Sequence, residues 1–119
     1  MATAPMPSRG EFWLVNFEPA IGSEIRKIRP ALVISLDGVG KLPLRMVVPI
    51  TDWKLQYTRF PWFTLITPDA GNGLIKDSGA DAFQTKSLAL VRFVRRMGFA
   101  TSIQLDDVAA AVALCVGAP

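Results

Sequence analysis

Short apolar runs separated by turn residues dominate the first hundred positions of the chain. Runs of this kind, bounded by Gly, Pro, Asn and Asp, predict β-strands. Residues 87–92 fit a helical turn and a loop equally well. We expect strands at residues 11–17, 31–35, 44–51, 62–67 and 91–97, and another through Leu74 and Ile75.

Two of these strands have informative local sequences. Residues 31–34 are continuously apolar, which is typical of a strand buried on both faces. Pro49 lies near the end of the third strand. Because proline has no N–H to give to a ladder, it predicts a sheet edge or a bulge at that point.

Apolar positions spaced by three and four residues predict a C-terminal helix. Ser102 is the expected N-cap of a helix from Ile103 to Val116. Its buried stripe would contain Leu105, Val108, Ala109, Val112 and Val116. One terminal helix after five or more strands predicts a mainly β fold with α, arranged as a strongly bent antiparallel sheet or barrel.

The 119 residues, half of them hydrophobic, are enough for one core and too few for two domains. We expect a single domain at residues 9–119 after a disordered lead at residues 1–8. No apolar stretch near the start has signal-peptide length, and the run at residues 108–116 is too short to cross a bilayer. The sequence therefore predicts a cytoplasmic protein without membrane association.

The chain contains no histidine, which excludes Ser/His and Cys/His hydrolases and His-ligated zinc enzymes. A single cysteine, Cys115, excludes internal disulfides and Cys-cluster metal sites, and its apolar surroundings predict a small buried side chain. The aspartates are scattered at turn positions. We therefore expect no metal and no cofactor.

Basic residues gather at two places, although 13 basic and 10 acidic residues leave a net charge of only +3. Such clusters fit a phosphate-facing patch and ordinary solvated charge equally well. The clusters are Arg26, Lys27 and Arg29, and Lys86, Arg92, Arg95 and Arg96.

A polar loop at residues 20–29 joins the first two strands, and such loops commonly carry function. It holds an acid, Glu24, besides its basic residues. Pro30 follows Arg29 and restricts it to extended backbone conformations. The Arg29 guanidinium should therefore project from a defined point at the start of a strand.

Ordered blocks of sequence run along nearly the whole chain. They are residues 9–11, 12–19, 22–33, 48–51, Gln84-Thr85-Lys86-Ser87 and the helix from Gln104. In this order they resemble the blocks of MazF/PemK-type toxins. The resemblance implies a homodimeric SH3-like barrel that cleaves single-stranded RNA without metal or cofactor and is held in check by a cognate antitoxin.

The resemblance also assigns roles to residues. Arg29 and Thr51 match the two catalytic positions, and two positions depart from the Kid/PemK branch, which has histidine at Ser23 and aspartate at Phe83. The expected RNA contacts are Ser23, Arg26, Lys27, Asp52, Trp53, Gln84 and Lys86.

RNA supplies its own nucleophile, the 2′-hydroxyl, so a protein must align it, neutralise the developing phosphorane charge and assist two proton transfers. The planar Arg29 fork suits the charge, and the Thr51 hydroxyl can donate to an oxygen. Glu24, the only acid in the loop, is the candidate acceptor of the 2′-proton. By resemblance, the products carry a 2′,3′-cyclic phosphate and a 5′-hydroxyl.

Other interpretations stay open. Arg29 could pair with Glu11 or Glu24, and Thr51 could be a plain strand-end hydroxyl. The aromatic residues between Trp53 and Trp62 could stack RNA bases or pack, with packing favoured for Trp62. The whole chain could be a non-catalytic or decayed toxin-fold protein, similar to CcdB, that binds a protein target, or an RNA-binding barrel that does not cut.

Overall fold

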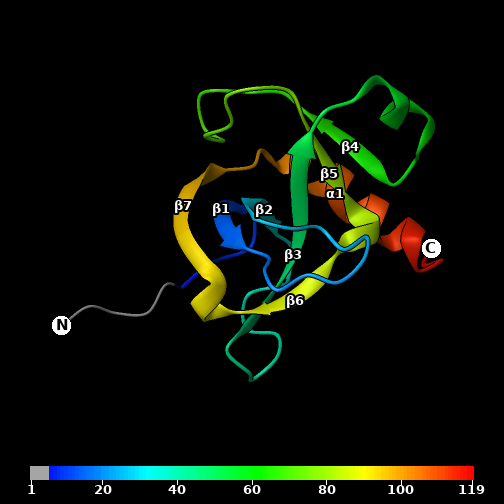
Figure 1. Ribbon diagram of the computed structural model, residues 1–119. Coiled ribbons are helices and arrows are strands. Elements are labelled where there is room, and N and C mark those ends of the chain that lie inside the picture. The colour runs from blue at the N-terminus through cyan, green and yellow to red at the C-terminus, as the bar shows by residue number, and fades with distance from the viewer. Residues whose placement is uncertain (1–5) are drawn as a thin grey trace.

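The computed structural model describes residues 6–119, which form a bent β-sheet followed by one α-helix (Figure 1). The predicted mainly β class with a C-terminal helix is confirmed. The strands are β1 (Glu11–Asn16), β2 (Ile28–Val33), β3 (Leu44–Asp52), β4 (Phe63–Ile66), β5 (Ser78–Asp81), β6 (Lys86–Ala89) and β7 (Phe93–Phe99). The helices are η1 (Leu55–Arg59), η2 (Ala82–Gln84), η3 (Leu90–Arg92) and α1 (Ser102–Cys115), of which the first three are short 3₁₀ helices.

All strand pairs are antiparallel, in the order β4-β5-β3-β2-β1-β7, with β6 also paired to β3. One edge of β3 pairs with β2, while its other edge pairs with β6 over residues 44–47 and with β5 over residues 50–52. Within the described residues β4 and β7 end the order without pairing to each other. The strongly bent sheet is thus confirmed, and it stays open instead of closing into a complete barrel.

Pro49 is buried and lies opposite Ala31 inside the sheet. On the other edge of β3, Val47 pairs with Lys86 and Ile50 with Ala80, so Pro49 falls where β3 changes partner. A missing N–H is tolerated where the ladder is interrupted. The edge position predicted for Pro49 is therefore wrong, and the interruption accounts for the proline.

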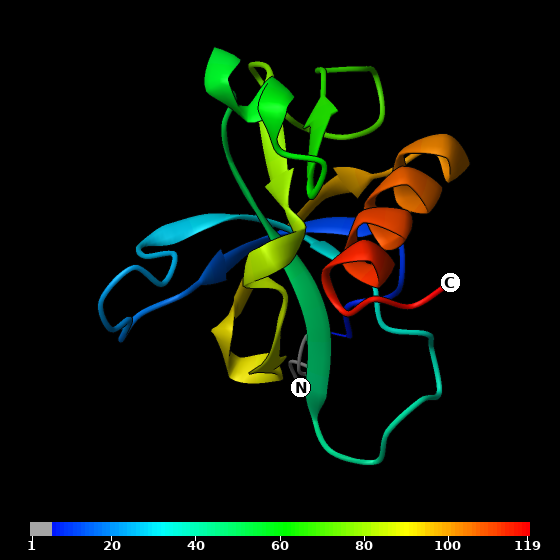
Figure 2. The same ribbon diagram turned by 90° about the vertical axis from the view of Figure 1, so that its right-hand side faces the viewer.

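The central strands bury both of their faces, as predicted for residues 31–34. Leu32 and Val48 join a cluster that includes Val108 of α1, and Figure 2 shows α1 lying along one side of the sheet. Ala31 and Val33 join a second cluster. The other members of that second cluster are Trp13, Val15, Phe17, Val47, Leu88 and Phe93.

The N-cap of α1 is Thr101 and not the predicted Ser102. The Thr101 hydroxyl accepts from the Gln104 N–H at 3.1 Å, and the Gln104 side chain accepts from the Thr101 N–H at 2.9 Å, which completes a capping box. Val108 is buried, while Val116 is 75% exposed because α1 ends at Cys115. The prediction that Val116 belongs to the buried stripe is therefore wrong.

The segment after β4 differs most from the expected order of strands. Leu74 and Ile75 form a loop, because the buried Asn72 side chain accepts from the Leu74 N–H at 3.0 Å and donates to the Thr67 carbonyl at 2.9 Å. The next strand is β5, which is buried along its whole length. Residues 86–92 divide into β6 and η3.

Of the predicted disordered lead, residues 1–5 lie outside the described residues. Pro7 is buried, and its carbonyl accepts from Arg45 Nε at 2.7 Å. The Ser8 N–H donates to Glu11 Oε1 at 2.8 Å. In the part of the chain that the structure describes, no helix is both long enough and apolar enough to span a membrane.

Candidate active site

Arg29 and Thr51, which lie 22 positions apart, meet on the neighbouring strands β2 and β3. Arg29 Nη1 donates to Thr51 Oγ1 over a long 3.5 Å contact, and Arg29 Nε donates to the Arg26 carbonyl at 2.7 Å. Both side chains are half-buried. The fold therefore brings the two predicted catalytic residues together and holds the guanidinium by one of its nitrogens.

Arg29 and Thr51 line a hollow of about 360 Å³. Its apolar wall includes Leu14, Ile50, Leu74 and Met97, and its charged rim consists of Arg29, Asp52, Lys76 and Arg95. Asp52 is neutralised by Lys76, whose Nζ lies 3.0 Å from Asp52 Oδ1. The hollow therefore keeps an excess of positive charge, as a site for a phosphate group requires.

Arg29 is not taken up by an ion pair. Among the described residues, no carboxylate oxygen lies within 4.0 Å of its guanidinium or of that of Arg95. Glu11 accepts from the Trp13 indole at 2.9 Å and pairs with Arg96 at 3.3 Å, whereas Glu24 pairs with Lys86. The pairing of Arg29 with Glu11 or Glu24 is therefore excluded.

Ser23, Glu24, Gln84 and Lys86 line a second hollow of about 530 Å³ together with Ile21, Phe83 and Thr85. Glu24 Oε1 accepts from the Ile21 N–H at 2.7 Å, and its Oε2 lies 4.0 Å from Lys86 Nζ. Glu24 is not among the residues that line the hollow of Arg29. The predicted site residues Arg29, Thr51 and Asp52 thus line one hollow, and Ser23, Glu24, Gln84 and Lys86 line the other, while Arg26, Lys27 and Trp53 line neither.

Gln84 holds the β1–β2 loop. Its side-chain oxygen accepts from the Ile25 N–H, and its Nε2 donates to the Ser23 carbonyl at 3.4 Å. Both contacts use the backbone of a segment about sixty residues away in the sequence, so the Gln84 amide connects η2 to the loop. An RNA contact by Gln84 stays a prediction.

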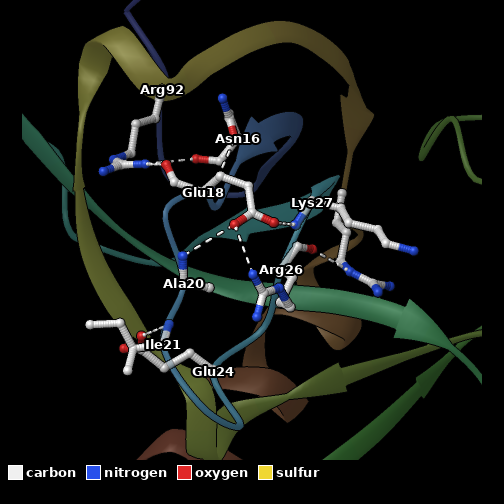
Figure 3. A network of polar contacts seen from close by, with 9 residues as sticks. Asn16, Glu18, Ala20, Ile21, Glu24, Arg26, Lys27 and Arg92 are labelled. Carbon is white, nitrogen blue, oxygen red and sulfur yellow. Dashed lines mark hydrogen bonds and ion pairs between the residues drawn. The ribbon is translucent and has the colours of Figure 1, made fainter.

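The Glu18 carboxylate, which the sequence did not single out, binds both ends of the same loop, at Ala20 and at Lys27 (Figure 3). These two ends are called its first and second stems. Glu18 Oε1 accepts from the Ala20 N–H at 3.2 Å and lies 3.6 Å from Arg26 Nη2, while its Oε2 accepts from the Lys27 N–H at 2.9 Å. The Lys27 hydrogen bond is the main reason why the pKa of Glu18 lies below its usual 4.5.

Arg92 anchors the first stem from the other side. Its Nη1 donates to the carbonyls of Asn16, at 3.3 Å, and Glu18, and Figure 3 shows its side chain reaching over the start of the loop. Arg92 belongs to a basic cluster that the sequence left open between a phosphate patch and solvated charge. The structure gives Arg92 backbone contacts.

Aromatic residues gather around η1. Tyr57 stacks on Phe63 with ring centroids 3.9 Å apart, and Phe60 stacks on Trp62 at 4.9 Å, as the packing interpretation of Trp62 expects. Trp53 meets Tyr57 edge to face at 5.7 Å, and the backbone N–H of Trp53 donates to the Asp77 carbonyl at 3.1 Å. Trp53 thus adjoins the segment that contributes Lys76 to the rim of the Arg29 hollow.

Cys115 is only partly buried, and it lines an apolar hollow of about 330 Å³ with Pro61, Trp62, Phe83 and Leu114. Burial raises the pKa of its thiol, which disfavours the reactive thiolate. Within residues 6–119, no three His, Cys, Asp or Glu side chains are grouped so that they could hold a metal ion.

The chain is similar to known proteins over almost its whole length. Residues 8–116 match a family model described as PemK-like, MazF-like toxin of type II toxin-antitoxin system. Endoribonuclease MazF9 of Mycobacterium tuberculosis (strain ATCC 25618 / H37Rv) is 32% identical over 115 residues, which cover 92% of this chain and 95% of that protein.

Two solved structures from Deinococcus radiodurans share the fold. The crystal structure of MazF (Form-I) has a TM-score of 0.75 at 25% identity, over 93% of this chain and 96% of that chain. A MazE-MazF structure (Form-II) has a TM-score of 0.66 at 26% identity, over 93% and 96% of the two chains.

Proposed function

Because the chain belongs to the PemK-like, MazF-like toxins of type II toxin–antitoxin systems, we propose that it is a toxin that cleaves single-stranded RNA in the cytoplasm. Its relative MazF9 is named an endoribonuclease. The observation that carries the proposal is the contact of Arg29 with Thr51 in a hollow whose rim has excess positive charge. That arrangement suits a phosphodiester.

The proposed reaction is a transesterification that needs only the RNA, the protein and solvent water. The ribose 2′-oxygen attacks the adjacent phosphorus and forms a new P–O2′ bond, while the P–O5′ bond breaks and its electron pair leaves with the 5′-oxygen. The 2′-hydroxyl proton passes to a base, and the 5′-oxygen takes a proton from water. The products are a 2′,3′-cyclic phosphate and a 5′-hydroxyl.

Arg29 stabilises the charge that develops on the non-bridging oxygens. Its Nε donates to the Arg26 carbonyl and one N–H of Nη1 to Thr51, which leaves Nη2 and the second N–H of Nη1 for phosphate oxygens. A guanidinium is a poor proton acceptor, so Arg29 acts as a donor and not as a base. The Thr51 hydroxyl donates a further hydrogen bond, to a non-bridging oxygen or to the departing 5′-oxygen.

Glu24 is our proposed acceptor of the 2′-proton. It lies in the loop that leads to Arg29, and its half-exposed carboxylate faces the second hollow. Because Glu24 does not line the Arg29 hollow, this role requires its loop to bring the carboxylate within hydrogen-bond reach of the 2′-hydroxyl when RNA binds. The residues proposed to contact the RNA are Ser23, Arg26, Lys27, Asp52, Trp53, Gln84 and Lys86.

Replacing Glu24 with glutamine should lower kcat for RNA cleavage by about 100-fold, because general base catalysis contributes roughly that much or more. Glutamine keeps an oxygen that can accept from the Ile21 N–H, so the loop is preserved. Single-turnover rates across a pH series measure the effect. A variant with the wild-type rate and the wild-type pH profile would remove Glu24 from this role.

We further propose that the toxin works as a homodimer and that an acidic segment of a cognate antitoxin inhibits it by occupying the same hollows. The family description names a toxin–antitoxin system, and the MazE-MazF structure from Deinococcus radiodurans supports such a partner. The cations Arg29 and Arg95, which are free of carboxylate partners within the described residues, would attract carboxylates as well as phosphates.

The direct test incubates the purified chain with single-stranded RNA in the presence of EDTA and maps the chemistry of both new ends. We expect 5′-hydroxyl and 2′,3′-cyclic phosphate ends, and a much lower rate for Thr51→Val, which removes only the hydroxyl. Intact RNA would contradict the proposal. Salt-dependent binding without turnover would indicate an RNA-binding barrel, and growth arrest with intact RNA a non-catalytic toxin.

A further inference from the structure

A continuous series of contacts joins Glu18 to the catalytic arginine. The Glu18 carboxylate holds the Lys27 N–H and the Arg26 side chain. The carbonyl of Arg26, in turn, accepts from Arg29 Nε at 2.7 Å, and Arg29 Nη1 reaches Thr51. Every link is a direct contact between neighbouring groups, and the carboxylate at its start touches neither Arg29 nor Thr51 within the described residues.

We propose that Glu18 is a positioning residue for Arg29, because its carboxylate holds the backbone of residues 26 and 27 in the conformation in which the Arg26 carbonyl accepts from Arg29 Nε and Arg29 Nη1 reaches Thr51. The role rests on the proposed function, since it is defined by the rate of RNA cleavage. Glu18 itself does not touch the RNA.

The backbone of Lys27 explains why this segment needs to be held. Lys27 has a φ of 72°, and no other described residue except glycine has a positive φ. Side chains with a Cβ rarely adopt this left-handed conformation, and for lysine it must be imposed by the surroundings. The Glu18 carboxylate accepts from the N–H of that same residue, and the Phe17 N–H donates to its carbonyl at 2.9 Å.

The backbone of Glu18, where this series of contacts begins, is also held in place. Arg92 Nη1 donates to the Glu18 carbonyl, and this contact joins the first stem of the loop to η3. Because the backbone of Glu18 is held there, its carboxylate provides a fixed point from which residues 26 and 27 are located. Figure 3 shows Glu18 between Arg92 on one side and Arg26 and Lys27 on the other.

The first experiment compares steady-state cleavage of a short single-stranded RNA by the wild type, Glu18→Ala and Asp106→Ala. Asp106 is an exposed helix acid without an ion pair among the described residues, so Asp106→Ala controls for the loss of one negative charge. We expect kcat of Glu18→Ala to fall by about 10- to 100-fold, because misplacing a catalytic group by about 1 Å costs up to that much. KM should change by less than about threefold, because uniform binding of the RNA is retained.

The second experiment is a rescue. In the Glu18→Ala background, Lys27→Gly removes the Cβ that opposes a positive φ, whereas Lys27→Ala removes the same charge and keeps the Cβ. We expect the double variant with glycine to have a kcat about three- to tenfold higher than the one with alanine. If Glu18→Ala only destabilised the fold, the two double variants would have the same kcat. Equal kcat values for the two double variants would overturn the proposal.

Glu18→Gln covers the case in which Glu18→Ala does not fold. An amide offers one acceptor oxygen where the carboxylate offers two, so either the Ala20 or the Lys27 N–H loses its partner. We expect a folded variant with kcat at least about threefold below the wild type. A wild-type kcat for Glu18→Gln or for Glu18→Ala overturns the proposal.

Arg29→Ala is measured in parallel to distinguish a failure of the proposed function from a failure of the role of Glu18. If the wild type leaves RNA intact, the proposed function fails, and the role of Glu18 fails with it. If the wild type cleaves, Arg29→Ala does not, and Glu18→Ala keeps the full kcat, only the role of Glu18 fails.

Discussion

Arg29→Ala should lower kcat for RNA cleavage by about 100- to 1,000-fold, the loss that follows when one preorganised donor to a developing oxyanion is removed. The fold should be unaffected, because the contacts of the guanidinium are the Arg26 carbonyl and the Thr51 hydroxyl, neither of which belongs to the core. Arg29→Lys should also be strongly impaired, since a single ammonium group cannot bond the Arg26 carbonyl and two phosphate oxygens in a fixed plane.

Single-turnover cleavage of a short RNA, together with thermal unfolding of each variant, measures this effect. Arg45→Ala is a matched control, because Arg45 also holds backbone carbonyls, those of Pro7 and Leu44, but lines neither of the two hollows. It should cleave at the wild-type rate. If Arg29→Ala retained that rate while folded, charge stabilisation by Arg29 would be ruled out.

Gly98→Ala should destabilise the fold by about 3 kcal/mol, at the upper end of the cost of overpacking a well-packed site. A Cβ at this buried position in β7 would lie 2.2 Å from the Gly71 carbonyl oxygen and 2.7 Å from the carbonyl carbon of Asn72. Both atoms belong to backbone, so no side chain can rotate away to make room. The loop at residues 69–76 would have to move, and with it Leu74 and Lys76 at the Arg29 hollow.

Thermal or urea unfolding of Gly98→Ala tests this prediction, and Gly71→Ala is its matched control. A Cβ on Gly71 would meet its nearest neighbours at 3.7 and 3.8 Å, which is ordinary contact, so its stability should change little. Comparable midpoints for Gly98→Ala and the wild type would mean that β7 and the facing loop are less tightly packed than these distances indicate.

The apolar pattern predicted best the strands that contact the core on both faces. Residues 31–34 pack into both clusters, and because all four are apolar, their sequence was sufficient to predict that both faces are buried. β5 has the sequence Ser-Gly-Ala-Asp, which carries almost no strand signal of its own, and it is extended because β3 and β4 pair with it from both sides. Ile75 looked like part of a strand but is 91% exposed in a loop that the buried Asn72 side chain organises.

In the candidate site, too, some residues could be predicted from the sequence and others depend on tertiary contacts. The resemblance assigned Arg29 and Thr51, and their contact agrees with it. Nothing in the sequence singles out Glu18, since its proposed role depends on the Lys27 N–H nine residues away. The sequence places Arg95 in a basic cluster but does not indicate which residues it faces, and no sequence pattern points to Lys76. Both reach the hollow only through the pairing of β7 and the path of the loop at residues 69–76.

Because β3 pairs with different strands along its length, it determines how the sheet can unfold. Of the described strands, β3 alone pairs with three others, so the β4-β5 and β1-β2-β7 parts of the sheet are joined through it. Neither part can lose β3 by a local fluctuation without exposing residues of both cores. Amide hydrogens in the middle of β3 should therefore exchange with solvent only on global unfolding, and the strand that carries Thr51 should persist for as long as the folded molecule itself.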